Sequence, residues 1–202
     1  MNTVLLSSYR KQFAYYRHLG EGAMQQLTDE ELFKDDEAES NSIAVIVKHL
    51  SGNMKSRWTD FLTTDGEKPW RNRDDEFSAD FPDRAALDLA WAQGWAVLEG
   101  AINDLRPEQL ADIVYIRNEG HTVAEALNRQ LAHYSYHIGQ IVLLGKQMKG
   151  NEWKPLSIPK GQSVAYNEGK FAEDKGVRNF IDGLMKESPN QSSNAPTNPN
   201  SN

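Results

Sequence analysis

The stretch from Ala124 to Lys146 reads AEALNRQLAHYSYHIGQIVLLGK and contains the strongest helix pattern of the chain. His133 and His137 are four residues apart, so both imidazoles project from one face of the predicted helix. Ile141 and other apolar residues share that face, which indicates that it turns toward the protein interior. Two histidines side by side on a buried face require an explanation.

Two explanations fit this pair. In the first, one imidazole is hydrogen-bonded in the core and the other lies near the edge of the apolar stripe, at the surface. In the second, both bind one divalent metal ion, at the metal–nitrogen distance of about 2.0–2.1 Å that imidazole ligands show. Because two ligands rarely hold an ion, the second explanation predicts a third ligand elsewhere in the chain.

The composition indicates one globular domain with appendages. The chain has 202 residues, of which 39% are hydrophobic and 25% charged. No apolar run approaches the roughly 20 residues of a membrane span. A formal charge of −7 argues against nucleic acid and anionic membranes as partners, since both attract basic surfaces, and favours small molecules or proteins. The N-terminus has no secretory signal pattern, so we expect a cytoplasmic protein.

The absence of cysteine restricts the chemistry further. Without cysteine there can be no disulfide and no thiolate metal ligand, so any metal must be held by nitrogen and oxygen atoms. A reaction that needs a thiol would have to take it from a second molecule.

The spacing of apolar residues predicts four long helices, over 3–27, 42–63, 83–105 and 124–146. The run IVYIR at 113–117 alternates and predicts an extended or hairpin-like segment. Thr122 and Glu125 form a capping-box pattern before the last helix. The predicted fold is all-α, a four-helix bundle with a long loop after the second helix and an extended C-terminal arm.

Three parts of the chain are expected. Residues 1–150 form the metal-binding bundle, and residues 151–187 form an arm that packs on it and includes one short helix over 171–186. Residues 188–202, SPNQSSNAPTNPNSN, have almost no apolar side chain and are expected to form a disordered tail.

The second predicted helix contains His49 beside its apolar face. Taken alone, His49 is more simply a core histidine. Gly52, however, removes a side chain one turn away at a cost to the helix of about 1 kcal/mol relative to Ala, which hints at room for a ligand. In a bundle, His49 can meet His133 and His137, and three histidines leave a coordination position open, as in catalytic zinc sites.

Three further residues are candidates for the chemistry. Asn53 lies one turn beyond His49. Its side chain could hydrogen-bond a species bound to the metal ion, or merely a neighbouring group of the protein. The long loop at 64–80, TDGEKPWRNRDDEFSAD, contains Arg71 and Arg73. This loop is either a polar connection or a lid whose arginines bind an anionic group of the substrate.

The motifs KHLSGNM at 48–54 and AHYSYHIGQI at 132–141 resemble those of the DinB/YfiT superfamily. The loop at 64–80 and the arm segment LSIPKGQS at 156–163 look like one branch of it, so the resemblance covers roughly residues 1–170. It implies a four-helix bundle in which His49, His133 and His137 bind a divalent metal, and it implies a homodimer. Imidazole ligands suit several metals; zinc or nickel is favoured, and iron or another metal is the alternative. The resemblance does not supply a substrate.

Two functions follow from the resemblance and the residues. The first is a metal-dependent enzyme, in which the ion activates an exogenous low-molecular-weight thiol, as in an S-transferase, or water, as in a hydrolase. The second is a non-catalytic metal-binding module in stress response or protein interaction. The two differ in whether a pocket reaches an open coordination position.

Overall fold

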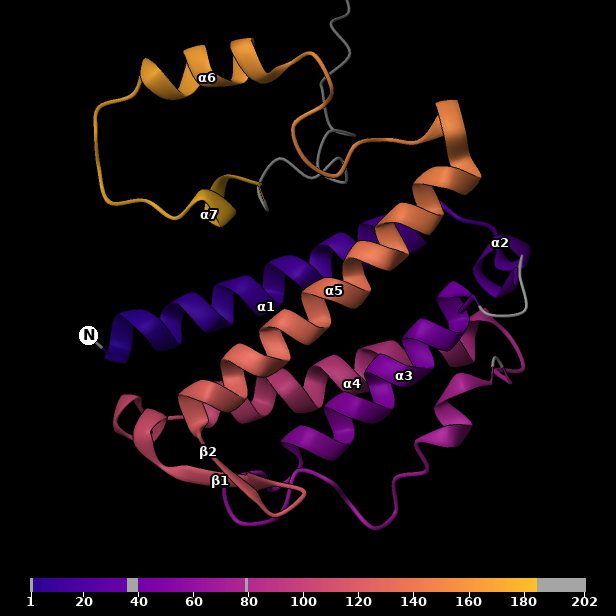
Figure 1. The fold of residues 1–202 in the computed structure, drawn as a ribbon. Coiled ribbons are helices and arrows are strands. Elements are labelled where there is room, and N and C mark those ends of the chain that lie inside the picture. Colours follow the sequence, from indigo (N-terminus) through magenta and orange to yellow (C-terminus); the bar gives the residue numbers. More distant parts are fainter. Residues whose placement is uncertain (1, 36–39, 79, 185–202) are drawn as a thin grey trace, which may run out of the picture. The chain divides into compact units, whose positions relative to one another are not determined.

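The longest helix that the structure describes is α5, Val123–Lys149 (Figure 1). The computed structural model describes residues 2–35, 40–78 and 80–184. Thr122 begins α5 with the predicted capping box: its hydroxyl accepts the N–H of Glu125, and the Glu125 carboxylate accepts the N–H of Thr122. Gly150 ends α5 with a φ of 51°, a conformation that glycine adopts without strain.

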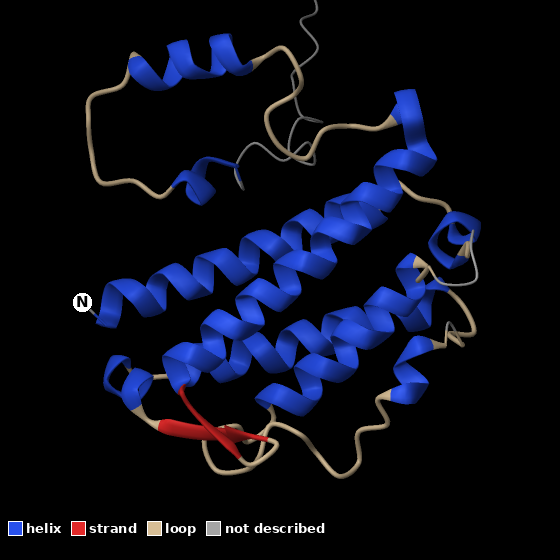
Figure 2. Cartoon of the chain, viewed as in Figure 1, coloured by secondary structure: helices blue, strands red, loops and turns tan. Residues whose placement is uncertain are grey.

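Three other long helices complete a bundle with α5: α1 (Asn2–Met24), α3 (Ile43–Trp58) and α4 (Arg84–Asp104). α1 packs along α5 and α3 along α4, while α3 also contacts α5 (Figure 2). Aromatic rings of Phe13, Trp95 and Tyr134 pack together in the core between these helices. The predicted all-α class is confirmed.

The helix α3 is buried almost all round, which explains its apolar start IAVIV. Ser42 caps it, because the serine hydroxyl accepts the N–H of Val45 at 3.2 Å. We expected this helix to continue to residue 63, but it ends at Trp58. Asp60 then adopts a φ of 47°, outside the right-handed helical range, and starts the turn that leads into the long loop.

The loop after α3 folds back along that helix. It contains a short 3₁₀ helix, η1 (Asp74–Phe77), which contacts α3. Lys48 of α3 holds this segment through ion pairs to Asp75 at 3.0 Å and Asp80 at 2.6 Å. The loop is therefore anchored over the middle of α3, where His49 lies.

The predicted hairpin is present between α4 and α5. Strands β1 (Ile113–Ile116) and β2 (Glu119–Thr122) pair antiparallel, with Ile113 opposite Thr122 and Ile116 opposite Glu119. Both turn residues, Arg117 and Asn118, have left-handed φ values of 57° and 62°, as tight two-residue hairpin turns require.

Asp65, in the loop after α3, joins that loop to the hairpin. Its carboxylate accepts the backbone N–H groups of Arg117 and Asn118, each at 2.8 Å. Gly66 adds a backbone hydrogen bond to the carbonyl of Tyr115 at 2.8 Å. These contacts fix the position of Arg117 relative to the loop.

Shorter elements complete the part of the chain up to Lys154, which forms one compact unit. They are α2 (Asp29–Phe33), η2 (Pro107–Ala111) and η3 (Gly150–Glu152). Lys149 at the end of α5 pairs with Glu31 of α2 at 2.7 Å. Within the described residues, no helix is both long and apolar enough to cross a membrane.

The second unit begins at Pro155 and contains α6 (Ser163–Phe171) and α7 (Phe180–Leu184). The expectation of one helix over 171–186 is wrong, because residues 173–179 are not helical and α6 ends where that helix was to start. Gly176 lies in this interruption, and glycine disfavours a helix by about 1 kcal/mol. The expected tail at 188–202 lies outside the described residues.

Candidate metal centre

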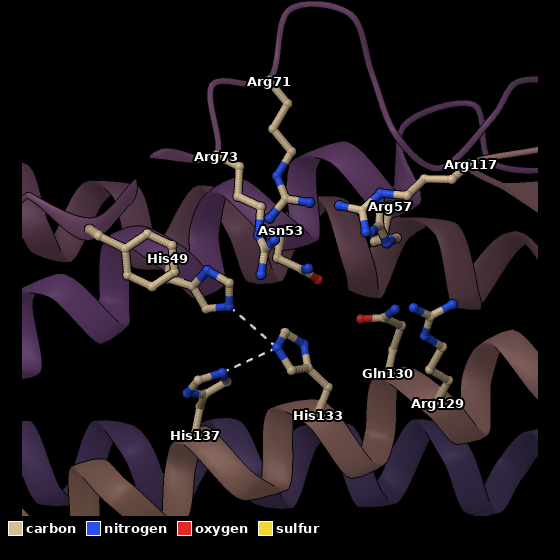
Figure 3. Close-up of a pocket in the computed structure, with 11 residues that line it drawn as sticks. His49, Asn53, Arg57, Arg71, Arg73, Arg117, Arg129, Gln130, His133 and His137 are labelled. Carbon is tan, nitrogen blue, oxygen red and sulfur yellow. Dashed lines mark hydrogen bonds between the residues drawn. The ribbon is translucent and has the colours of Figure 1, made fainter. Parts of the chain in front are cut away.

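Three histidines meet between α3 and α5 (Figure 3). His49 comes from α3, and His133 and His137 come from successive turns of α5. Nε2 of His133 lies 3.3 Å from Nε2 of His49 and 3.1 Å from Nε2 of His137. One ligand nitrogen from each of the three lies within 4.8 Å of the others, so the structure brings the three predicted ligands together.

The other ring nitrogens of two of these histidines have acceptors. Nδ1 of His49 lies 3.0 Å from Oε2 of Glu76, and Nδ1 of His137 lies 2.7 Å from Oε1 of Gln140. Since a carboxylate and an amide oxygen only accept hydrogen bonds, each Nδ1 is the protonated nitrogen when its imidazole is neutral. This tautomer leaves the Nε2 lone pair of both His49 and His137 directed at the third histidine.

Hydrogen bonds among the three histidines cannot provide a partner for every Nε2 atom. Nε2 of His133 has one position for a proton and can donate it to His49 or to His137, but not to both. The Nε2 lone pair of at least one of His49 and His137 is then left without a proton to accept, which is unfavourable unless a cation lies beside it. The donor set therefore fits a divalent metal, for which neutral imidazole nitrogens with hydrogen-bonded Nδ1 groups are common ligands.

Burial favours the neutral form of His133 and His137. It lowers the pKa of His133 to about 3, with further lowering from the neighbouring His137 and His49. Burial also lowers the pKa of His137, although the hydrogen bond to Gln140 opposes this shift. Neutral imidazole is the form that binds a metal, so the bundle supplies these two side chains in the required state.

Glu76 of η1 positions His49 and is itself held by Arg71. The Arg71 guanidinium makes a bidentate pair with it, at 2.7 and 2.8 Å, and both side chains are at most 5% exposed. Burial alone would raise the pKa of Glu76, but the hydrogen bonds from Arg71 and His49 outweigh burial and lower that pKa. Glu76 is therefore an ionised carboxylate that accepts the His49 N–H.

Gly52 makes room for this carboxylate. A Cβ added at Gly52 would lie 2.8 Å from Cδ of Glu76, closer than packed atoms approach. We expected the missing side chain to leave space for a ligand, but Glu76 occupies that space. The glycine supports the histidine cluster indirectly, because it lets η1 approach α3 closely enough for Glu76 to reach His49.

The Asn53 side chain is buried and its orientation is set by a chain of hydrogen bonds. The indole N–H of Trp58 donates to the Tyr134 hydroxyl at 3.0 Å, and that hydroxyl donates to Oδ1 of Asn53 at 3.1 Å. Tyr134 is fully buried. Because Oδ1 is engaged, the amide N–H groups of Asn53 are the atoms that it can offer to a ligand in the adjacent cavity.

A cavity of about 300 Å³ lies beside the histidines, and all three of them line it. The two arginines predicted from the loop also line it, and Figure 3 shows both reaching from the loop toward the space above α5. Each nitrogen of the Arg71 guanidinium lies within 3.4 Å of a carboxylate oxygen of Glu76 or Glu67. Arg73, in contrast, has no carboxylate partner among the described residues.

Sequence reasoning missed several residues of this site. Glu76 and Gln140, which orient two histidines, were not singled out, although Gln140 follows His137 by one helical turn in the motif HIGQ. Other cavity residues were also missed, because they come from α3, η1, the hairpin turn and α5 and meet only in the folded chain: Arg57, Phe77, Arg117, Arg129 and Gln130.

The fold and the site define a helical-bundle protein with a partly buried three-histidine cluster that opens into an arginine-lined cavity. The chain belongs to the family described as "Protein of unknown function (DUF1572)", which matches residues 1–162. That match includes all four long helices and every residue of the cluster and cavity. No curated protein and no solved structure matched the chain.

Proposed function

We propose that the chain is a DinB-like, metal-dependent enzyme, in which His49, His133 and His137 hold one divalent ion, with zinc or nickel favoured. The observation that supports it best is the convergence of three Nε2 atoms whose lone pairs cannot all be satisfied within the trio. When bound, such an ion supplies a Lewis acid that makes an exogenous small thiol or a water molecule nucleophilic at neutral pH.

The residues around the trio have separate roles in this proposal. Glu76 and Gln140 fix the ring orientation of His49 and His137, and Arg71 holds Glu76 in place. Asn53 offers its amide N–H groups to the substrate, and Arg73 binds an anionic part of it. These roles assign Arg71 to positioning and leave substrate binding to Arg73.

The site is compatible both with transfer of an alkyl or acyl group to a thiol and with hydrolysis. The chain has no thiol of its own, so either nucleophile, an exogenous thiol or water, would enter through the cavity. The alternative is a non-catalytic metal-binding module. The cavity favours the enzyme, because it reaches the histidines directly, whereas a structural metal is normally closed off by a fourth protein ligand.

The test is elemental analysis of protein purified without an affinity tag. We expect one divalent ion per chain in the parent and in His18→Ala, and loss of most of it in His133→Ala. The parent with its ion restored is then screened for thiol transfer and for hydrolysis. Full metal content in His133→Ala would refute the site, and a metal-loaded parent inactive in both screens would favour the non-catalytic module.

A further inference from the structure

The cavity beside the histidines has an unusual charge. Half of the chain's ten arginines line it, although the chain as a whole has a formal charge of −7. They come from α3, the loop before η1, the hairpin turn and α5: Arg57, Arg71, Arg73, Arg117 and Arg129. No aspartate, glutamate or lysine of the described chain lines the cavity.

Carboxylates behind the wall neutralise only part of this charge. Glu67 pairs with Arg57 at 3.1 Å and with Arg117 at 3.0 Å, and it also lies 3.4 Å from Arg71. Glu76 pairs with Arg71. Two carboxylates therefore oppose five guanidinium groups. Within the described chain, Arg73 and Arg129 have no acidic partner, so the cavity keeps an excess of about three positive charges.

Two buried polar atoms of the cavity wall also lack partners. Nε of Arg57 and Oε1 of Gln130 have no hydrogen-bond partner among the described residues, and the two residues are only 7% and 3% exposed. Leaving such buried groups unpaired costs about 1–3 kcal/mol each, so buried polar atoms are normally satisfied. Both atoms are almost fully shielded from solvent, so a ligand in the cavity would reach them only after side-chain movement.

From these observations we infer that the cavity binds a small ligand with at least two negative charges, through carboxylate or phosphate oxyanions. Arginine suits this role, because its planar fork binds either group through two parallel hydrogen bonds. A cavity of about 300 Å³ lies at the lower end of small-molecule sites and admits a metabolite but no macromolecule. The inference rests on the proposed function in one respect: the anion would be the substrate, or part of it, held beside the histidines.

Calorimetric titration of the full chain tests this inference with three probes. Succinate carries two carboxylates, succinamate has the same length with one, and inorganic phosphate represents phosphate esters. We expect succinate or phosphate to bind at least tenfold more tightly than succinamate, and the tighter of the two identifies the oxyanion. Equal affinity for all three probes, or no binding of any, would overturn the inference.

Variants locate the binding and separate it from the metal. Arg73→Gln and Arg129→Gln should each weaken the dianion about tenfold, which corresponds to about 1.4 kcal/mol. Neither change leaves a known carboxylate unpaired. Arg106→Gln, in an ion pair whose side chains are 67% and 69% exposed, is the matched control and should bind as the parent does.

His133→Ala distinguishes the two proposals. If it loses metal and still binds the dianion, with an affinity lowered only by the loss of the neighbouring cation, both stand. If the parent holds metal while neither cavity arginine affects the dianion, the inference fails and the proposed function survives. If the parent holds no metal but the arginine variants lose the dianion, the proposed function fails and the inference survives.

Discussion

Glu76 connects two parts of the site at the scale of single residues. Its carboxylate accepts the His49 N–H at 3.0 Å and the paired N–H groups of Arg71. Acceptors of this kind hold metal-binding imidazoles in one tautomer and orientation, and removing them typically costs about 10–100-fold in metal affinity.

Glu76→Gln should therefore weaken zinc binding by about 10–100-fold, because a neutral amide is a poorer acceptor for His49. Glu67→Gln is the matched control, since Glu67 contacts the same Arg71 but not His49. Competition with a chromophoric chelator measures both affinities. An equal loss in the two variants would mean that Glu76 acts through general electrostatics and not through the orientation of His49.

The histidines could be predicted from the sequence, whereas the residues that orient and surround them could not. The pair His133 and His137 is local, because one helical turn brings them together, and the predicted bundle together with the motif resemblance added His49. The contact of Glu76 with His49 spans 27 positions and depends on the path of an irregular loop. No periodicity describes such a path, so Glu76 looked like one more charge in a polar loop.

At the scale of elements, the position of His49 depends on how closely α3 and α4 pack. Gly94 of α4 faces Ser51 of α3, and a Cβ added there would lie 3.0 Å from the Ser51 Cα. The contact is with backbone, which cannot rotate away as a flexible side chain can. The two helices therefore approach each other beside the residues that bear the site.

Gly94→Ala should destabilise the protein by about 1–2 kcal/mol, because overpacking between the helices exceeds the gain in helix propensity. Gly100, on the same helix, provides the control, since an added Cβ there meets nothing within 4 Å. Gly100→Ala should stabilise by about 0.5–1 kcal/mol. Urea unfolding measures both, and equal stabilisation by the two changes would show that the helices separate without cost.

Helix starts could be predicted more accurately than helix ends. The predicted capping box of Thr122 and Glu125 is present, because capping uses side chains within three residues of one another. Ser42 caps α3 and the Thr28–Glu31 pair caps α2 in the same way. The end of α3 at Trp58 and the break between α6 and α7 were not predicted. The first depends on loop contacts with the hairpin and the second on a weak local preference.

At the scale of the whole molecule, every residue of the cluster and the cavity lies in the unit that ends at Lys154. Near this boundary the ring of Trp153 packs against Gly145 of α5, and the N–H of Lys154 donates to Oε1 of Gln26. These contacts lie within the same unit, so they do not need the chain that follows.

A chain shortened to residues 1–154 should therefore bind metal with the same stoichiometry as the full chain. Elemental analysis of the two proteins measures this. Loss of metal from the shortened chain would show that the part after Lys154 contributes to the site. The melting temperature tests whether the 151–187 arm packs on the bundle. If it does, as predicted, the melting temperature should fall when the chain is shortened.

Glu76 also has a consequence for how ligands affect each other. One carboxylate contacts both a histidine of the cluster and an arginine of the cavity, so a metal ion at the cluster and an anion in the cavity would each change the electrostatic surroundings of the other. An anion beside a cation should give positive heterotropic linkage, and thermodynamic reciprocity requires the same factor in both directions. A dissociation constant for the anion then has a defined meaning only at a stated free-metal concentration, and the reverse holds for the metal.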